Sequence, residues 1–287
     1  MDMEKIAIIT DSTCGVPDEY LKKYSNIEVM RLKIIYGEDE FVDGLNITPE
    51  EVYKKLENGQ IPTTSMPSVQ DAVDLMEKLK NQGYTHVIGM FISSGLSGTM
   101  NSFRIAASQF EGKLKSFIFD SKMISMAVGF LIIEIAKLIE EGVSFDNICK
   151  EIPKMKERVT MYFSVDTLEY LIKGGRIGKV SGAIGQMLKL KPIITMDDED
   201  GKYTTASKVR GSKKALSELI KLGTEALDKG KSKVAVMTGT MQEEAEKLLE
   251  AFKAHKNTTF DYIGTFTPVI GVHSGPRIIA FAVMNEE

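Results

Sequence analysis

Residues 86–99, HVIGMFISSGLSGT, contain the stretch of sequence that decides the fold of the first half of the chain. The apolar run from His86 to Ile92 is typical of a buried strand, and the residues from Met100 to Phe110 have helical apolar spacing. Between them lie three serines, one threonine and two glycines. Such a junction can bind an anion, because the first N–H groups of the helix and its dipole point out of the helix N-terminus. The alternative is that Ser97 or Thr99 only caps the helix.

Two other predicted strands end in the same way. The strand from Lys5 to Thr10 is followed by Asp11-Ser12-Thr13, and the strand from Leu114 to Phe119 is followed by Asp120-Ser121-Lys122. Strands that alternate with helices predict a parallel, Rossmann-like sheet with right-handed crossovers. Ligands of such sheets bind beyond the carboxyl ends of the strands, so we expect the three loops to face one crevice.

The length of 287 residues suits two domains rather than one. A change of composition between Glu151 and Arg158 predicts the boundary. We expect an α/β domain at residues 1–155 that carries the serine-rich loops, and an α+β domain at residues 156–287 that completes the ligand site. Two segments that contain prolines or glycines, residues 61–68 and 268–276, are predicted to be loops.

The composition is that of an ordinary globular protein, with 43% apolar and 26% charged residues. The net charge is −4, and basic residues are interspersed with acidic ones, which argues against a nucleic-acid partner. Cys14 and Cys149 have no spacing typical of a disulfide framework or a metal site, which suits a reducing compartment. The N-terminus has no signal-peptide pattern, and the apolar stretch from Met123 to Ile133 is too short to cross a bilayer. We therefore expect a cytoplasmic protein.

No complete motif for a phosphate, a dinucleotide or a metal is found in the sequence. Residues 174–179 resemble a phosphate-binding P-loop, but their glycine spacing is wrong and Val180 replaces the hydroxyl residue that would hold magnesium. The histidines have no metal-ligand spacing; they are His86, His255 and His273. We expect neither a cofactor nor a metal site.

A serine hydrolase remains an open alternative at this point. The segment Gly95–Thr99 fails the nucleophile-elbow pattern, because Thr99 stands where the last glycine belongs. A triad of Ser94, His273 and Asp11 can still be drawn, and it would act on an acyl ester. His273 lies in a glycine-rich segment rather than on an apolar face, so a role in the core is less favoured for it than for His86.

Eight short motifs occur along the chain in an order that matches a known family. They are Ile9-Thr-Asp-Ser-Thr13, Pro62-Thr-Thr-Ser-Met-Pro-Ser68, Ser93-Ser-Gly-Leu-Ser-Gly-Thr99, Phe119-Asp-Ser-Lys122, Val165-Asp-Thr-Leu-Glu169, Gly174-Gly-Arg-Ile-Gly178, Leu190-Lys-Pro-Ile193 and His273-Ser-Gly-Pro276. With these motifs the sequence resembles the DegV family of bacterial fatty-acid-binding proteins along nearly its whole length. Each motif alone is weak, but eight in register are specific.

The resemblance implies a carrier that is not itself an enzyme. Such a carrier binds a single long-chain, palmitate-like fatty acid and presents its carboxylate to a separate ATP-dependent fatty acid kinase. The acyl phosphate that forms then enters phospholipid synthesis. The bound fatty acid is the ligand, no cofactor is implied, and transient contact with a membrane is expected.

The resemblance also implies which residues bind the carboxylate. The family's binding threonine maps onto Thr63 or Thr64, its serine onto Ser93 or Ser94, and His273 is expected near the carboxylate. We predict no catalytic residue among them.

Two arginines are implied in contacts of the carrier with other molecules. Arg176 and Arg210 are the expected contacts with the kinase or the membrane. The sequence departs from the family at Met66, where glutamine is frequent, and at Arg277, where small residues are common. Both departures concern the entrance of the expected site.

Simple energetics agree with a lipid ligand. A buried methylene contributes about 0.8 kcal/mol, so a long acyl chain contributes on the order of 10 kcal/mol, against about 1–3 kcal/mol for a charge-assisted head-group bond. We therefore expect the tail to supply most of the affinity from an apolar tunnel, and the hydroxyl loops to fix the orientation. The apolar helix from Ile124 to Ile139 is the predicted wall of this tunnel.

Overall fold

The computed structural model describes residues 4–186 and 190–286 and divides the chain into two compact units. Unit 1 contains the chain up to Lys33 together with Ser65–Glu157, and unit 2 contains Ile34–Thr64 together with the chain from Arg158 onward. The last crossing, after Glu157, lies close to the boundary predicted at residue 155. Residues 34–64, which the sequence analysis placed in the first domain, belong to unit 2 instead.

Unit 1 is built on a parallel sheet of four strands in the order β2-β1-β6-β7. The strands are β1 (Ile6–Asp11), β2 (Ile27–Met30), β6 (His86–Met90) and β7 (Lys115–Phe119). All six residues of β1 are buried, as in a strand covered on both faces. The predicted parallel, Rossmann-like sheet is therefore confirmed.

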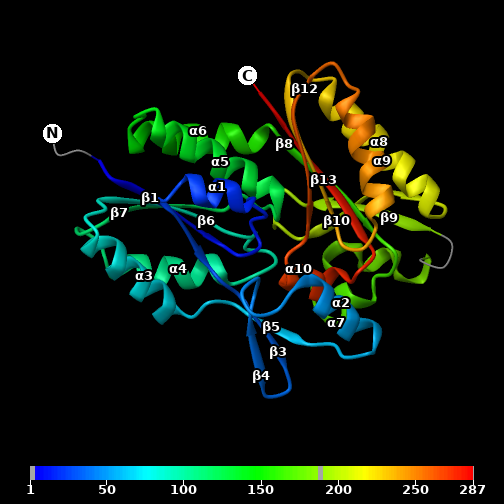
Figure 1. The fold of residues 1–287 in the computed structure, drawn as a ribbon, viewed down its shortest axis with the longest axis horizontal. Coiled ribbons are helices and arrows are strands. Elements are labelled where there is room, and N and C mark those ends of the chain that lie inside the picture. The colour runs from blue at the N-terminus through cyan, green and yellow to red at the C-terminus, as the bar shows by residue number, and fades with distance from the viewer. Residues whose placement is uncertain (1–3, 187–189, 287) are drawn as a thin grey trace. The chain divides into compact units, whose positions relative to one another are not determined.

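Helices cover both faces of this sheet (Figure 1). The helices are α1 (Asp18–Lys23), α3 (Val69–Asn81), α4 (Thr99–Ser108), α5 (Met126–Glu140) and α6 (Phe145–Glu157). On one side α3 packs against α4, and on the other α5 packs against α6 and β1. Ten of the 15 residues of α5 are buried, so it forms much of the apolar interior of unit 1. No helix in the described part of the chain combines the length and the apolar character needed to cross a membrane.

Asp11 joins the carboxyl ends of the two central strands of unit 1. Its side chain is fully buried at the end of β1. Oδ1 accepts hydrogen bonds from the backbone N–H of Thr13 at 2.9 Å and from its hydroxyl at 2.6 Å. Oδ2 accepts the N–H of Ile92, just past the end of β6, at 2.7 Å. Burial raises the pKa of Asp11, and these three hydrogen bonds, which lower it, only partly offset that effect.

We expect Asp11→Asn to lower the free energy of unfolding by about 2–3 kcal/mol, because the amide group confronts a buried N–H donor with another donor. Urea unfolding measures this loss. Asp146→Asn is the matched control, since Asp146 is an exposed residue paired with Lys115 and should cost less than about 1 kcal/mol. Equal losses for the two variants would contradict the structural role of Asp11.

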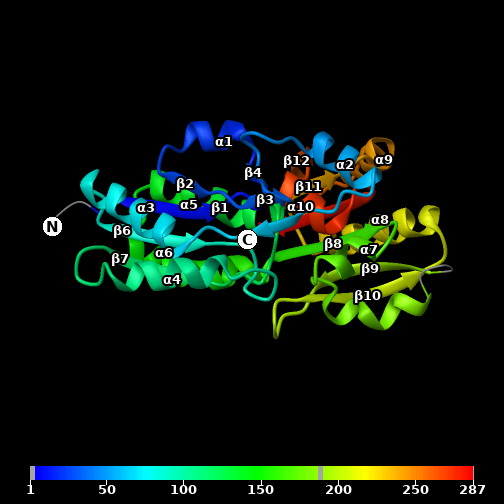
Figure 2. The same ribbon diagram turned by 90° about the horizontal axis from the view of Figure 1, so that it is seen from below.

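Unit 2 contains a mixed sheet of six strands in the order β10-β9-β8-β13-β11-β12. The strands are β8 (Val159–Val165), β9 (Lys191–Met196), β10 (Tyr203–Val209), β11 (Ser232–Thr238), β12 (Thr258–Thr265) and β13 (Ile278–Asn285). The two long helices α8 (Ser212–Leu227) and α9 (Gln242–Lys253) pack against each other and against this sheet (Figures 1 and 2). The expected α+β character of the second half is confirmed.

The shorter elements of unit 2 bring residues 34–64 onto it. A small sheet has the order β4-β3-β5, with β3 (Lys33–Tyr36), β4 (Asp39–Val42) and β5 (Thr63–Ser65). The helices are α2 (Pro49–Glu57), α7 (Glu169–Lys173), α10 (Pro268–Ser274) and the 3-10 helix η1 (Gly178–Gln186). Helix α2 packs against α10, and α10 packs against α7. This packing of α2 gives the physical reason why residues 34–64 belong with the second half of the chain.

Two segments predicted as loops contain regular structure. Residues 268–274 form α10, with Pro268 at the first helical position and Gly275 at the C-cap with φ of 76°. Proline and glycine here begin and end a helix rather than break one. Within residues 61–68, Thr63–Ser65 form the short strand β5. Both loop predictions were therefore wrong for these residues.

Candidate functional site

The serine-rich loop of unit 1 begins directly after β6 and is held by the loop that follows β7. The Ser94 hydroxyl donates to the carboxylate of Asp120, and the Ser94 N–H donates to Asp120 Oδ1 at 3.3 Å. The same oxygen accepts the N–H of Lys122 at 3.0 Å. Ser93 is buried and its N–H donates to the Met123 carbonyl at 2.8 Å, whereas Ser94 is exposed. The three hydroxyl-rich loops of unit 1 thus lie together at the carboxyl edge of the sheet, and that they face one ligand-binding crevice stays a prediction.

The capping alternative applies to the second half of this loop. Helix α4 begins at Thr99, and its N-cap, Gly98, has no side chain to offer. Ser97 Oγ accepts the N–H of Thr99 at 3.3 Å and lies 2.9 Å from the Thr99 hydroxyl. Ser97 and Thr99 therefore serve the helix start, which leaves Ser93 and Ser94 as the candidates for a ligand.

The predicted threonine and histidine of unit 2 are in contact. Thr64 Oγ1 lies 2.8 Å from His273 Nε2, although 209 positions separate the two residues. Thr64 is in β5 and half-buried, and its neighbour Thr63 is exposed. Of the two threonines that the resemblance left open, Thr64 is the one that meets the histidine.

His273 is packed against a glycine turn. A Cβ atom on Gly174 would lie 2.1 Å from His273 Nδ1, so the imidazole occupies the space that any side chain at position 174 would need. Among the residues described here, Nδ1 has no hydrogen-bond partner. Burial, together with the nearby Arg176 guanidinium, lowers the pKa of His273 to about 4. The ring is therefore neutral at physiological pH, with one nitrogen on Thr64 and one unused.

Because the pKa of His273 is about 4 in the folded chain and 6.5 ordinarily, the unfolded chain binds more protons between these values. The free energy of unfolding should therefore fall by about 2 kcal/mol from about pH 7 to about pH 5 through this residue. Urea unfolding of the wild type and of His273→Gln at both pH values measures this difference. Ser108→Ala, which removes no titratable group, should keep the wild-type slope. Identical slopes in wild type and His273→Gln would refute the assignment.

The two arginines have different surroundings. Arg176 is half-buried, and its Nη1 donates to the Gly174 carbonyl of its own turn at 2.6 Å. Arg210 is exposed between β10 and α8. Arg210 therefore has the accessibility that contact with another macromolecule requires, whereas Arg176 lies close enough to lower the pKa of His273.

The structure does not support Asp11 as the acid of the hydrolase triad. Both oxygens of Asp11 accept hydrogen bonds within unit 1, from Thr13 and from Ile92, so this carboxylate is not free to orient a histidine. The Ser94 hydroxyl donates to Asp120, and its base in such a triad would be a histidine. Across residues 4–186 and 190–286, no cluster of three His, Cys, Asp or Glu side chains has an arrangement suited to a metal ion.

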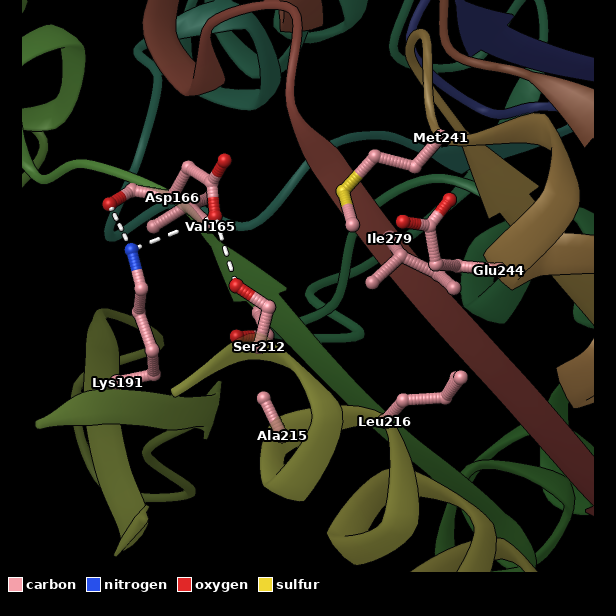
Figure 3. A pocket seen from close by; sticks show the side chains of 10 residues that line it. Val165, Asp166, Lys191, Ser212, Ala215, Leu216, Met241, Glu244 and Ile279 are labelled. Carbon is pink, nitrogen blue, oxygen red and sulfur yellow. Dashed lines mark hydrogen bonds and ion pairs between the residues drawn. The ribbon is translucent and has the colours of Figure 1, made fainter. Parts of the chain in front are cut away.

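A separate pocket of about 310 Å³, including the open space at its mouth, lies in unit 2 (Figure 3). Its floor is apolar, and Asp166, Lys191 and Ser212 stand together on one side, with Glu244 on another. The residues that line it are Ser164, Val165, Asp166, Lys191, Ser212, Ala215, Leu216, Met241, Glu244 and Ile279. None of the residues predicted to bind the carboxylate belongs to this set.

Two residues with clear structural roles were missed from sequence. The sequence places Asp120 in a loop but does not identify it as the acceptor for Ser94, and it does not identify Gly174 as the residue against which His273 packs. The strand register held a signal for Asp120, because Met90 pairs with Phe119 in the parallel sheet and Asp120 follows directly. No sequence signal pointed to Gly174.

Comparison with known proteins decides the family. A sequence model described as "Uncharacterised protein, DegV family" matches residues 5–286. The chain belongs to the DegV family. A DegV domain-containing protein of Clostridium acetobutylicum is 44% identical over 284 residues, which cover 99% of this chain and 100% of that protein.

Solved structures of DegV proteins share the fold. A fatty-acid-binding DegV family protein from Thermus thermophilus has a TM-score of 0.92 and 28% identity, and the match covers 98% of this chain and 100% of that one. A stearic-acid-binding protein from Eubacterium ventriosum has a TM-score of 0.87 and 28% identity, with 98% of each chain covered. The α/β architecture derived above is thus the DegV fold.

Proposed function

We propose that this DegV protein binds one long-chain fatty acid and acts as its carrier rather than as an enzyme. The observation that carries the proposal is the match, over 98% of the chain, to DegV structures named for fatty acid binding. The hydrolase alternative receives no support from Asp11, whose oxygens already accept hydrogen bonds within unit 1.

In this proposal the carboxylate is bound by hydroxyl groups and a neutral imidazole, drawn from Ser93, Ser94, Thr63, Thr64 and His273. The contact between Thr64 and His273 supports a shared role for these two residues. A hydrogen bond from a hydroxyl to a carboxylate is charge-assisted and contributes about 1.5–3 kcal/mol.

Asp120 adds a condition to the role of Ser94. Both the N–H and the hydroxyl of Ser94 donate to the Asp120 carboxylate in the structure. A ligand carboxylate that accepts the Ser94 hydroxyl must therefore replace Asp120 as the acceptor. Because the N–H and hydroxyl of Ser94 already donate to one carboxylate, that of Asp120, their geometry suits the carboxylate of a ligand.

The acyl tail supplies most of the affinity in this proposal. With about 0.8 kcal/mol per buried methylene, an 18-carbon chain contributes on the order of 10 kcal/mol, several times the contribution of the head group. The helix α5, with ten buried residues, is the proposed wall of the apolar tunnel.

The carrier presents the carboxylate to a separate ATP-dependent kinase, whose product serves phospholipid synthesis in the bacterial cytoplasm. Arg176 and Arg210 are the proposed contacts with the kinase or, transiently, with the membrane. The exposure of Arg210 supports such a contact. Arg176 is less well supported, because it is half-buried and donates to the Gly174 carbonyl of its own turn.

The direct test is the lipid content of the purified protein. We expect organic extraction and mass spectrometry to yield about one long-chain fatty acid per chain, because a tail this long dissociates slowly. A folded sample without lipid, which also fails to bind palmitate after delipidation, would refute the carrier. Turnover of an ester that disappears in Ser94→Ala would establish the hydrolase instead.

Head-group variants test the residues. We expect delipidated Ser94→Ala and Thr64→Val each to bind palmitate about tenfold more weakly, since each loses one hydrogen bond to a charged group while the tail contacts remain. Titration calorimetry measures the affinity. Ser108→Ala is the control, because this exposed serine donates only to the Ile105 carbonyl of its own helix. Wild-type affinity in either variant would remove that residue from the site.

A further inference from the structure

Asp166 is the centre of a cluster of hydrogen bonds and ion pairs at the end of β8. Its carboxylate accepts from Nε of Arg277 and lies 3.3 Å from Nζ of Lys191. Its backbone N–H donates to the Arg277 carbonyl at 3.1 Å, and its carbonyl accepts from Lys191 Nζ at 2.5 Å. Figure 3 shows Lys191 and Ser212 pointing toward Asp166 at the side of the pocket. One residue thus fastens the start of β9 and the segment before β13 to the end of β8.

The ion pairs favour the charged form of Asp166. Burial raises the pKa of Asp166, but Arg277 and Lys191 together hold it below its usual value. The Asp166 side chain is 30% exposed and that of Arg277 is 50% exposed, so solvent screens this ion pair in part. The side-chain pair with Arg277 lies beside the backbone bond between the same two residues, and together they fix both the distance and the orientation of the two segments.

The two chain segments that begin at Asp166 and Arg277 come together again at His273. One runs from Asp166 through α7 to Gly174, and the other runs backward from Arg277 through Gly275 to His273. Between them, Tyr170 lies against Gly275, where a Cβ atom would be 2.2 Å from the ring. The segments meet a second time where a Cβ on Gly174 would be 2.1 Å from His273 Nδ1. At both contacts a ring packs directly against a glycine, in space where not even a Cβ atom would fit. We therefore expect a shift at the base of α7 or α10 to move the imidazole.

We propose that Asp166 and Arg277 are positioning residues of the head-group site: their ion pair sets the spacing of α7 and α10 and thereby places the His273 imidazole against Thr64. This inference rests on the proposed function only in taking His273 and Thr64 as part of a carboxylate site, and the contacts themselves do not depend on it.

The test is the titration of the three histidine rings by NMR in the full-length, delipidated protein. We expect Arg277→Ala to raise the pKa of His273 from about 4 by about one unit or more, because a displaced ring becomes hydrated. The affinity for palmitate should fall about tenfold at the same time. His86 and His255 in the same sample serve as internal references. Arg277→Lys, which keeps the charge, should return both values part of the way to wild type.

Two further variants bracket the result. Gly174→Ala pushes the ring directly and should shift the His273 signals at least as far as Arg277→Ala does. Lys253→Ala breaks an ion pair of 3.2 Å with Asp261, elsewhere in unit 2 and similarly exposed, and should leave the His273 titration and the affinity unchanged. If Arg277→Ala does not fold, Asp166→Asn, which keeps the shape and loses the charge, is measured in its place.

The proposal is overturned if Arg277→Ala or Asp166→Asn melts at a lower temperature yet keeps the wild-type titration of His273. That outcome would mean that the ion pair stabilises the fold without positioning the imidazole. The His273 titration does not depend on the ligand. A wild-type protein that fails to bind palmitate would therefore refute the proposed function, while the shift of His273 in the variants would still decide the positioning role.

Discussion

The hydrogen bonds of the buried Asp11 carboxylate are the interaction on which the carboxyl edge of the sheet in unit 1 depends. A buried charge is costly unless its oxygens accept hydrogen bonds, and those of Asp11 accept from two residues that belong to different loops. The consequence is that the ends of β1 and β6 cannot separate without exposing an unpaired carboxylate. Ser93 follows directly after Ile92, one of these donors, so the serine loop starts from a fixed point rather than from a free strand end.

The parallel sheet and the convergence of its loops were predictable because both follow from local patterns. Three of the four strands of the N-terminal sheet are apolar runs followed by short polar, hydroxyl-rich loops, and parallel topology places those ends together. The contact between Thr64 and His273 joins residues 209 positions apart, so only the family resemblance pointed to it. Periodicity carries no information about which distant segments pair.

The errors have the same origin. Helix α10 is predicted as a loop because its seven residues contain proline and glycine. Gly271 has a packing reason instead: a Cβ atom at this position would lie only 2.7 Å from Cε1 of the Tyr53 ring. The assignment of residues 34–64 to the first domain failed because α2 packs on this helix from a distant part of the sequence. In both cases tertiary packing overrode a correct reading of local preferences.

The discontinuous make-up of unit 2 has a consequence for synthesis of the chain. The strands of the parallel sheet in unit 1 are complete once Phe119 has been made, and the unit itself ends at Glu157. Residues 34–64 are made early, but their packing partner α10 is the last of the described helices to be made. About 200 residues separate Thr64 from α10, so at about 5–20 residues per second this segment waits on the order of 10–40 seconds for its packing partner. The two exposed carboxylates of β4, Asp39 and Glu40, and the capping box of α2, which is formed within the helix itself, suit a segment that spends this time in water.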